Sequence, residues 1–127
     1  MSVSGVACIS IVDDDESIRE ALTSLLASIG FRTQVFASAE DLLNSGRLQD
    51  TDCLIVDVWM PGMGGLELQS ELSAAGSRVP IVFMTAHDDE DVRTRALKAG
   101  AVDFLHKPFS EEALLAGLQS ALARRRR

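Results

Sequence analysis

Hydrophobic residues along this chain gather in short runs that alternate with longer stretches of helical spacing. Most of the runs are continuous and only a few residues long, which is typical of strands buried on both faces. The run at 31–36 instead alternates apolar and polar residues, which suits an edge strand with one covered face. We expect five strands, at 6–12, 31–36, 54–57, 80–84 and 101–105.

Between these runs, apolar residues recur every three or four positions, as they do on one face of an amphipathic helix. Ser17 and Glu20 have the spacing of a capping box for the first helix, and Gly30 is placed to end it. We expect five helices, at 18–29, 38–43, 66–75, 88–99 and 110–122. Five strands that alternate with five helices predict an α/β fold, a parallel sheet covered by helices on both faces.

The carboxyl ends of the strands in such a sheet lie at one rim, where ligands bind. Asp57 ends the central apolar run and is soon followed by Pro61 and Gly62, so we expect it to emerge at this rim. Residues that follow the first, fourth and fifth strands reach the same rim: Asp13, Asp14, Thr85 and Lys107.

Three converging carboxylates repel one another, so either a pKa rises or a cation binds between them. Mg²⁺ is the expected cation because it prefers hard oxygen ligands and takes only one or two carboxylates directly. The Thr85 hydroxyl and the Lys107 ammonium, together with Mg²⁺, would neutralise a phosphoryl group carried on Asp57. Taken alone, Asp57 is equally explained as a loop residue that caps a turn or a helix.

Composition limits the possible classes of protein. The 127 residues, 46% of them hydrophobic and 24% charged, fit one globular domain, with its core at about 6–122 and the start of a linker at 123–127. A net charge of -7 argues against a polyanion as a general partner. Without a leader or an apolar run of about 18 residues, we expect a cytoplasmic protein with no membrane contact. Cys8 and Cys53 lie in apolar runs and are interpreted as core residues rather than a disulfide.

The residues at the expected rim occur in a specific order along the chain: Val12-Asp13-Asp14-Asp15, Asp57 with Met60-Pro61-Gly62 and Gly65, Met84-Thr85-Ala86, and Lys107-Pro108-Phe109. This set resembles the receiver domains of bacterial two-component response regulators. Ser38-Ala39-Glu40, the stretch 100–104 and the leucine-rich last helix are most similar to the FixJ type. The resemblance implies a flavodoxin-like fold with strand order 2-1-3-4-5. It also implies a signalling domain, not a turnover enzyme, that transfers a phosphoryl group from a sensor histidine kinase to itself and later hydrolyses it.

The resemblance further implies a role for each residue at the rim. Asp57 would be the phosphoacceptor, and Thr85 and Lys107 would bind the phosphoryl group. Phe104 matches an aromatic residue that swings inward when Thr85 moves, and the Lys107–Pro108 bond matches one that is cis in the family. Mg²⁺ would be held by Asp14, Asp57 and the backbone carbonyl of Trp59, with Asp13 acting through water. We also interpret Trp59 and His87 as candidates for shielding the phosphoryl group from water.

The expected output surface comprises the fourth helix, the fifth strand and the fifth helix. The fourth helix has a thin apolar stripe, mainly Val92, Ala96 and Leu97, which favours an element that can shift. A homodimer through this surface is possible. The arginines at 124–127 are interpreted as helix-dipole partners or the start of a linker, so DNA would be contacted only by an output domain outside this chain.

Three other functions compete with a phosphorylated receiver. Asp13-x-Asp15 matches the start of haloacid-dehalogenase-like phosphatases, in which the first Asp is the nucleophile. A flavodoxin-like nucleotide binder is disfavoured because successive aspartates would repel its phosphate. A pseudo-receiver that only docks to a partner is disfavoured by the complete set of acids, Thr85 and Lys107.

Overall fold

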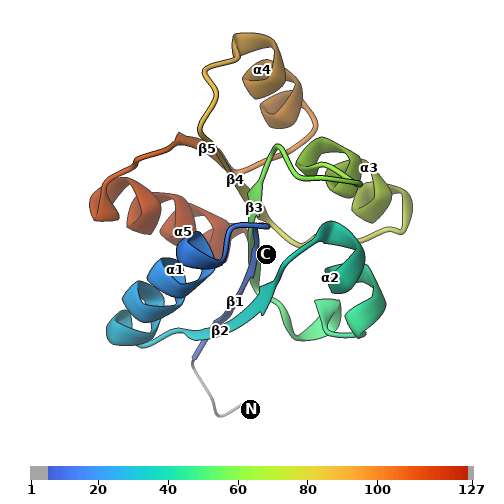
Figure 1. The fold of residues 1–127 in the computed structure, drawn as a ribbon. Coiled ribbons are helices and arrows are strands. Elements are labelled where there is room, and N and C mark those ends of the chain that lie inside the picture. The colour runs from blue at the N-terminus through green and yellow to red at the C-terminus, as the bar shows by residue number, and fades with distance from the viewer. Residues whose placement is uncertain (1–5, 126–127) are drawn as a thin grey trace.

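The computed structural model describes residues 6–125 and consists of a five-stranded parallel sheet between two layers of helices (Figure 1). The strand order is β2-β1-β3-β4-β5, as the family resemblance implies, and β2 lies at an edge as its alternating pattern predicts. The strands are β1 (Cys8–Val12), β2 (Arg32–Phe36), β3 (Cys53–Asp57), β4 (Ile81–Thr85) and β5 (Asp103–His106). The helices are α1 (Glu16–Ile29), α2 (Ala39–Ser45), α3 (Gly65–Ala74), α4 (Glu90–Lys98) and α5 (Glu111–Arg125), with a short 3-10 turn at Leu48–Asp50.

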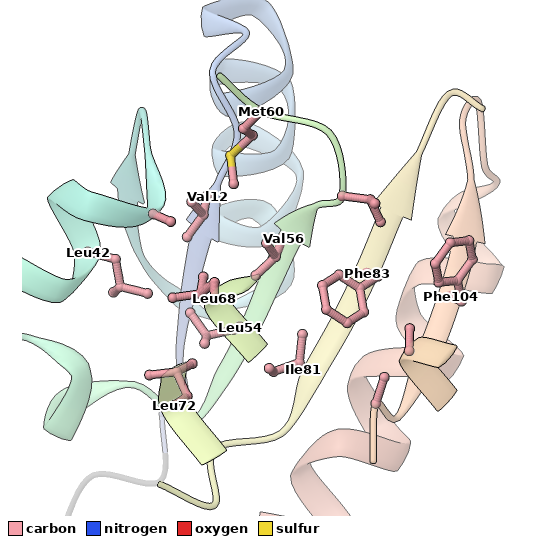
Figure 2. Close-up of a cluster of buried hydrophobic side chains, with 14 of the residues drawn as sticks. Val12, Leu42, Leu54, Val56, Met60, Leu68, Leu72, Ile81, Phe83 and Phe104 are labelled. Carbon is pink, nitrogen blue, oxygen red and sulfur yellow. The ribbon is translucent and has the colours of Figure 1, made fainter. Parts of the chain in front are cut away.

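Two hydrophobic clusters hold the layers together, one on each face of the sheet. Helices α1 and α5 cover one face, where Leu26, Leu114 and Leu118 pack on alternate residues of the central strands. Helices α2, α3 and α4 cover the other face, where Leu42, Leu68 and Phe83 are fully buried (Figure 2). Strands β1, β3 and β4 are buried along their whole length, as continuous apolar runs predict.

The start of α1 differs from the sequence prediction. Asp15 is the N-cap, and its Oδ1 accepts hydrogen bonds from the backbone N–H groups of Ser17 (2.8 Å) and Ile18 (3.4 Å). The predicted capping box of Ser17 and Glu20 is therefore wrong, because Asp15, two residues before Ser17, is the N-cap and Ser17 lies inside the helix. Gly30 ends the helix as predicted, with a positive φ of 110°.

Some apolar residues that the sequence pattern assigns to buried faces are exposed in the structure. Val6 is 44% exposed and lies before β1, and Ile29 is 40% exposed at the end of α1. In α4, Val92 and Ala96 are buried but Leu97 is 37% exposed, so the apolar contact of this helix with the sheet rests on two side chains. The weak packing predicted for α4 agrees with the structure.

Cys8 in β1 and Cys53 in β3 are buried free thiols, which agrees with their interpretation as core residues. Arg124 Nη1 donates a hydrogen bond to the carbonyl of Gly100, just beyond α4, at 2.8 Å. The arginines at 126–127 lie outside the described residues.

Across 6–125, no helix combines the length and the apolar character needed to span a membrane.

Candidate functional site

The three aspartates predicted at the rim converge at the carboxyl ends of β1 and β3. These strands are hydrogen-bonded neighbours, with Val12 paired to Val56, so the residues that follow them emerge side by side. Carboxylate oxygens of Asp13, Asp14 and Asp57 all lie within 4.8 Å of one another. Three carboxylate oxygens at this spacing form the kind of donor set that suits a hard divalent cation such as Mg²⁺.

Asp13 is fully buried, and both of its carboxylate oxygens have partners in the protein. Oδ1 accepts from the backbone N–H of Asp15 at 2.9 Å, and Oδ2 accepts from Lys107 Nζ at 3.0 Å. Arg19 Nη1, from α1, donates to the backbone carbonyl of Asp13 at 2.8 Å and so fixes this turn. Asp14 is exposed instead, and within 6–125 its carboxylate has no hydrogen bond or ion pair. The two neighbouring acids therefore differ in how freely they can take a ligand.

Asp57 is buried, and this burial raises the pKa of its carboxyl group from 3.8 to about 6. Lys107 Nζ, 3.7 Å from Oδ1, opposes the increase in pKa, whereas the negative charges of Asp13 and Asp14 add to it. The backbone N–H of Trp59 donates to the carboxylate and also lowers its pKa. The three carboxylates thus carry more negative charge than Lys107 alone can balance.

Strands β4 and β5 bring Thr85 and Lys107 to the same rim. The backbone N–H of Lys107 donates to the carbonyl of Thr85 at 2.7 Å, which continues the register in which Thr85 pairs with His106. Thr85 is 1% exposed, and its Oγ1 accepts from the backbone N–H of His87 at 3.0 Å. The Lys107–Pro108 peptide bond is cis.

Trp59 and Phe104, two aromatic residues with predicted roles, each contact a second ring. The rings of Trp59 and His87 meet edge to face, with centroids 6.0 Å apart, and Trp59 is 49% exposed. Phe104 is 7% exposed, and its ring centroid lies 6.2 Å from that of Phe83. Phe104 is thus turned into the cluster shown in Figure 2.

Gly65 lets α3 begin directly against the end of β3. A Cβ atom there would lie 2.8 Å from the backbone oxygen of Asp57 and 2.9 Å from the Cα of Val58. The N–H of Gly65 donates to the carbonyl of Val58 at 2.8 Å and closes the loop between them. Sequence reasoning missed Arg19 and Glu40, which contact the loops of the site from α1 and α2. No sequence pattern indicates either contact. The one available signal is that Arg19 lies one turn into the helix that follows Asp13.

A family model for the response regulator receiver domain matches residues 9–119. The chain belongs to the response regulator receiver family. The resemblance stated from the sequence is therefore confirmed, and the phosphatase and docking-module alternatives are not favoured. The motifs that carried the resemblance lie within the matched residues.

Individual relatives are also response regulators. The response regulator protein TmoT of Ectopseudomonas mendocina is 47% identical over 90% of this chain and 52% of its own length. The transcriptional regulatory protein FixJ of Azorhizobium caulinodans is 40% identical over 91% of this chain and 55% of its own. A solved structure of the response regulator StyR superimposes with a TM-score of 0.86 at 45% identity, over 96% of this chain and 63% of that one. The receiver spans about half the length of the curated relatives it matches.

Proposed function

We propose that this receiver accepts a phosphoryl group on Asp57 from the phosphohistidine of a sensor histidine kinase. In the transfer, the nitrogen–phosphorus bond of the donor breaks, a bond from phosphorus to an Asp57 carboxylate oxygen forms, and the histidine keeps its electron pair. The observation that carries the proposal is the placement of Lys107 Nζ 3.7 Å from Asp57 Oδ1, beside two further carboxylates. A nucleophile flanked by an ammonium and a cation-binding acid pair fits the stabilisation of a transferred phosphoryl group.

Mg²⁺ would be held by Asp14, Asp57 and the backbone carbonyl of Trp59, with Asp13 acting through a bound water. When bound, it would neutralise charge on the phosphoryl oxygens. The division between the acids is supported by their hydrogen bonds, because the oxygens of Asp13 already have partners and those of Asp14 have none within 6–125. Asp13 is therefore suited to orient a ligand, and Asp14 to bind the cation directly.

Phosphorylation would be read out through Thr85. Its Oγ1 holds the N–H of His87 at the start of the loop to α4, so drawing Thr85 towards a phosphoryl oxygen would release this loop. Phe104 would then turn further inward, towards the space Thr85 leaves. The surface formed by α4, β5 and α5 would change because α4 buries only two apolar side chains, those of Val92 and Ala96. We propose that two receivers dimerise through this same surface.

The phosphodonor partner needs a surface beside Lys107. An apolar groove of about 520 Å³ lies there between α1 and the loop after β5, lined by Ile18, Leu22, Leu25, Pro108 and Phe109 among others. We place the docking of the sensor kinase in this groove, since a kinase bound there could direct its phosphohistidine at the rim. We propose that the protein acts in the cytoplasm. The output is transcriptional, through a DNA-binding domain beyond residues 1–127, by analogy with the relatives named as transcriptional regulators.

The proposal is tested by intact-mass analysis after incubation with acetyl phosphate and Mg²⁺. The wild-type chain should gain the mass of one phosphoryl group, and chelation of Mg²⁺ should prevent the gain. The Asp57→Asn variant should gain nothing, whereas Asp13→Asn should still be modified, more slowly. Loss of modification in Asp13→Asn together with full modification of Asp57→Asn would support the phosphatase hypothesis instead.

A further inference from the structure

Glu40, on the first turn of α2, contacts the loop that carries Trp59. Its Oε2 accepts a hydrogen bond from the backbone N–H of Met63 at 3.0 Å, across 23 positions of sequence. Glu40 is exposed, so this contact is not a by-product of core packing. A charged acceptor also makes a stronger hydrogen bond to a backbone N–H than a neutral one does.

The backbone beside this contact is shaped to admit the carboxylate. Gly62 has a φ of 76°, and a Cβ atom on it would lie 2.8 Å from Glu40 Oε2. Any larger residue at this position would push the carboxylate away from Met63 as well as strain the backbone. The contact between Glu40 and Met63 therefore depends on a glycine at position 62.

The rest of the loop has restraints of its own. The N–H of Val58 donates to the carbonyl of Met84 in β4 at 3.0 Å, and the ring of Trp59 contacts that of His87. The N–H of Gly64 donates to Glu67 Oε1 at 2.9 Å, the N–H of Gly65 donates to Val58, and the side chain of Met60 is buried. Glu40 adds a restraint from α2, which lies outside the β3–α3 segment and on the face of the sheet opposite α1. Trp59 lies between the points fixed at Val58 and at residues 60–63.

We propose that Glu40 is a positioning residue for the metal centre, which acts by fixing the loop from Val58 to Gly65 and with it the backbone carbonyl of Trp59. The inference rests on the proposed function, since it assigns that carbonyl to Mg²⁺. Glu40 itself touches Met63 and not the rim, so its effect passes through the geometry of the loop. Without it, the carbonyl of Trp59 samples more positions and Mg²⁺ binds less tightly.

Asp41 provides a matched control on the same turn. Both residues are exposed acids in the first turn of α2, so removing either one costs the helix the same favourable charge near its N-terminus. Within 6–125, the side chain of Asp41 makes no hydrogen bond, whereas that of Glu40 holds Met63. A difference in Mg²⁺ affinity between Glu40→Ala and Asp41→Ala therefore reports the contact between Glu40 and the loop.

The experiment compares Glu40→Ala, Glu40→Gln and Asp41→Ala with the wild type by NMR of the ¹⁵N-labelled chain. Amide hydrogen exchange at Met63 is measured without metal, and Mg²⁺ alone is then titrated. Glu40→Ala should speed exchange at Met63 by about ten-fold and weaken Mg²⁺ binding by about three- to ten-fold. Glu40→Gln keeps an acceptor oxygen but makes a weaker, neutral hydrogen bond, so both of its effects should be smaller than those of Glu40→Ala. Asp41→Ala should stay within about two-fold of the wild type.

Three results would overturn the role of Glu40. One is unchanged Mg²⁺ affinity in Glu40→Ala despite faster exchange at Met63. Another is an equal loss of affinity in Glu40→Gln without faster exchange, which would assign the effect to charge. The third is an equal loss in Asp41→Ala. A wild-type chain that binds no Mg²⁺ would instead overturn the proposed function, and with it this role, so the wild-type titration separates the two failures.

Discussion

Lys107 Nζ lies 3.0 Å from Asp13 Oδ2, although the strands that these residues follow, β5 and β1, are separated in the sheet by β3 and β4. The long side chain of Lys107 therefore reaches across the rim and over the end of β3, where Asp57 lies. The 1% exposure of the Asp13 side chain makes this a buried ion pair rather than a surface contact. The ammonium of Lys107 thus offsets the repulsion between these two buried carboxylates.

Replacing Lys107 should destabilise the metal-free receiver. Lys107→Met leaves Asp13 and Asp57 without their ammonium, and we expect a loss of about 1–3 kcal/mol, smaller than for a fully buried pair because Lys107 keeps some exposure. Urea unfolding without metal measures this loss, and saturating Mg²⁺ should restore part of it. Lys98→Met on exposed α4 is the control and should change stability by less than about 0.5 kcal/mol. Equal stability of Lys107→Met and the wild type would contradict the role given to this ion pair.

The raised pKa of Asp57 predicts a pH-dependent stability. Its carboxyl group has a pKa of about 6 in the folded chain and 3.8 as an unperturbed group, so the folded state holds the proton more tightly. The resulting stabilisation is fully present below pH 3.8 and is lost as the pH rises through about 6. Asp57→Asn removes this ionisation and should be more stable than the metal-free wild type at pH 7.5, by about 1–3 kcal/mol.

Urea unfolding of both proteins at pH 5 and pH 7.5, in the presence of a chelator, checks this prediction. The advantage of Asp57→Asn should shrink at the lower pH and should also shrink when Mg²⁺ is added at pH 7.5. An advantage that is the same at both pH values would mean that the ionisation of Asp57 is not its source.

The corrected start of α1 gives a simple comparison of two variants. Asp15→Ala removes the carboxylate that accepts from the N–H groups of Ser17 and Ile18, and it should cost about 1 kcal/mol of stability. Ser17→Ala removes a side chain with no capping contact and should be nearly neutral. Thermal unfolding of the two variants distinguishes the observed cap from the predicted one, and the reverse order would contradict the structure.

The edge-to-face pair of Trp59 and His87 leads to a prediction about the lifetime of the phosphorylated state. If the two rings keep water from the phosphoryl group, Trp59→Ala should shorten the half-life of phosphorylated Asp57 several-fold, and His87→Ala should do so to a smaller degree. The half-life is followed by intact mass after removal of the phosphodonor. Leu97→Ala, at another exposed apolar residue, serves as the control. Unchanged half-lives in both ring variants would leave the pair without this role.

The sequence predicted the parts of this molecule that depend on short-range patterns. Continuous apolar runs identify β1, β3 and β4 because a strand buried on both faces tolerates few polar residues. Since parallel strands all end at one rim, the placement of Asp13, Asp57 and Thr85 follows from the runs alone. The boundaries were less accurate, because Ser17 and the acids just before it can each cap a helix and the pattern does not select among them.

Contacts between distant residues could not be predicted from the sequence. The hydrogen bond from Met63 to Glu40 spans two elements, and nothing in the spacing of either residue indicates it. The pairing of Trp59 with His87 depends on how two loops fold over the rim. The different hydrogen bonds of Asp13 and Asp14 likewise arise from the turn after β1, because adjacent residues of one type carry no pattern that separates them.

The most direct test of the account is a crystal structure of the receiver grown with Mg²⁺ and beryllofluoride, a phosphoryl mimic that attaches to a carboxylate. We expect beryllium bonded to an oxygen of Asp57 and Mg²⁺ coordinated by Asp14, Asp57 and the carbonyl of Trp59. Thr85 Oγ1 and Lys107 Nζ should each lie within hydrogen-bonding distance of a fluorine, about 3 Å. A mimic attached to Asp13, or bound without contact to Thr85 and Lys107, would contradict the account.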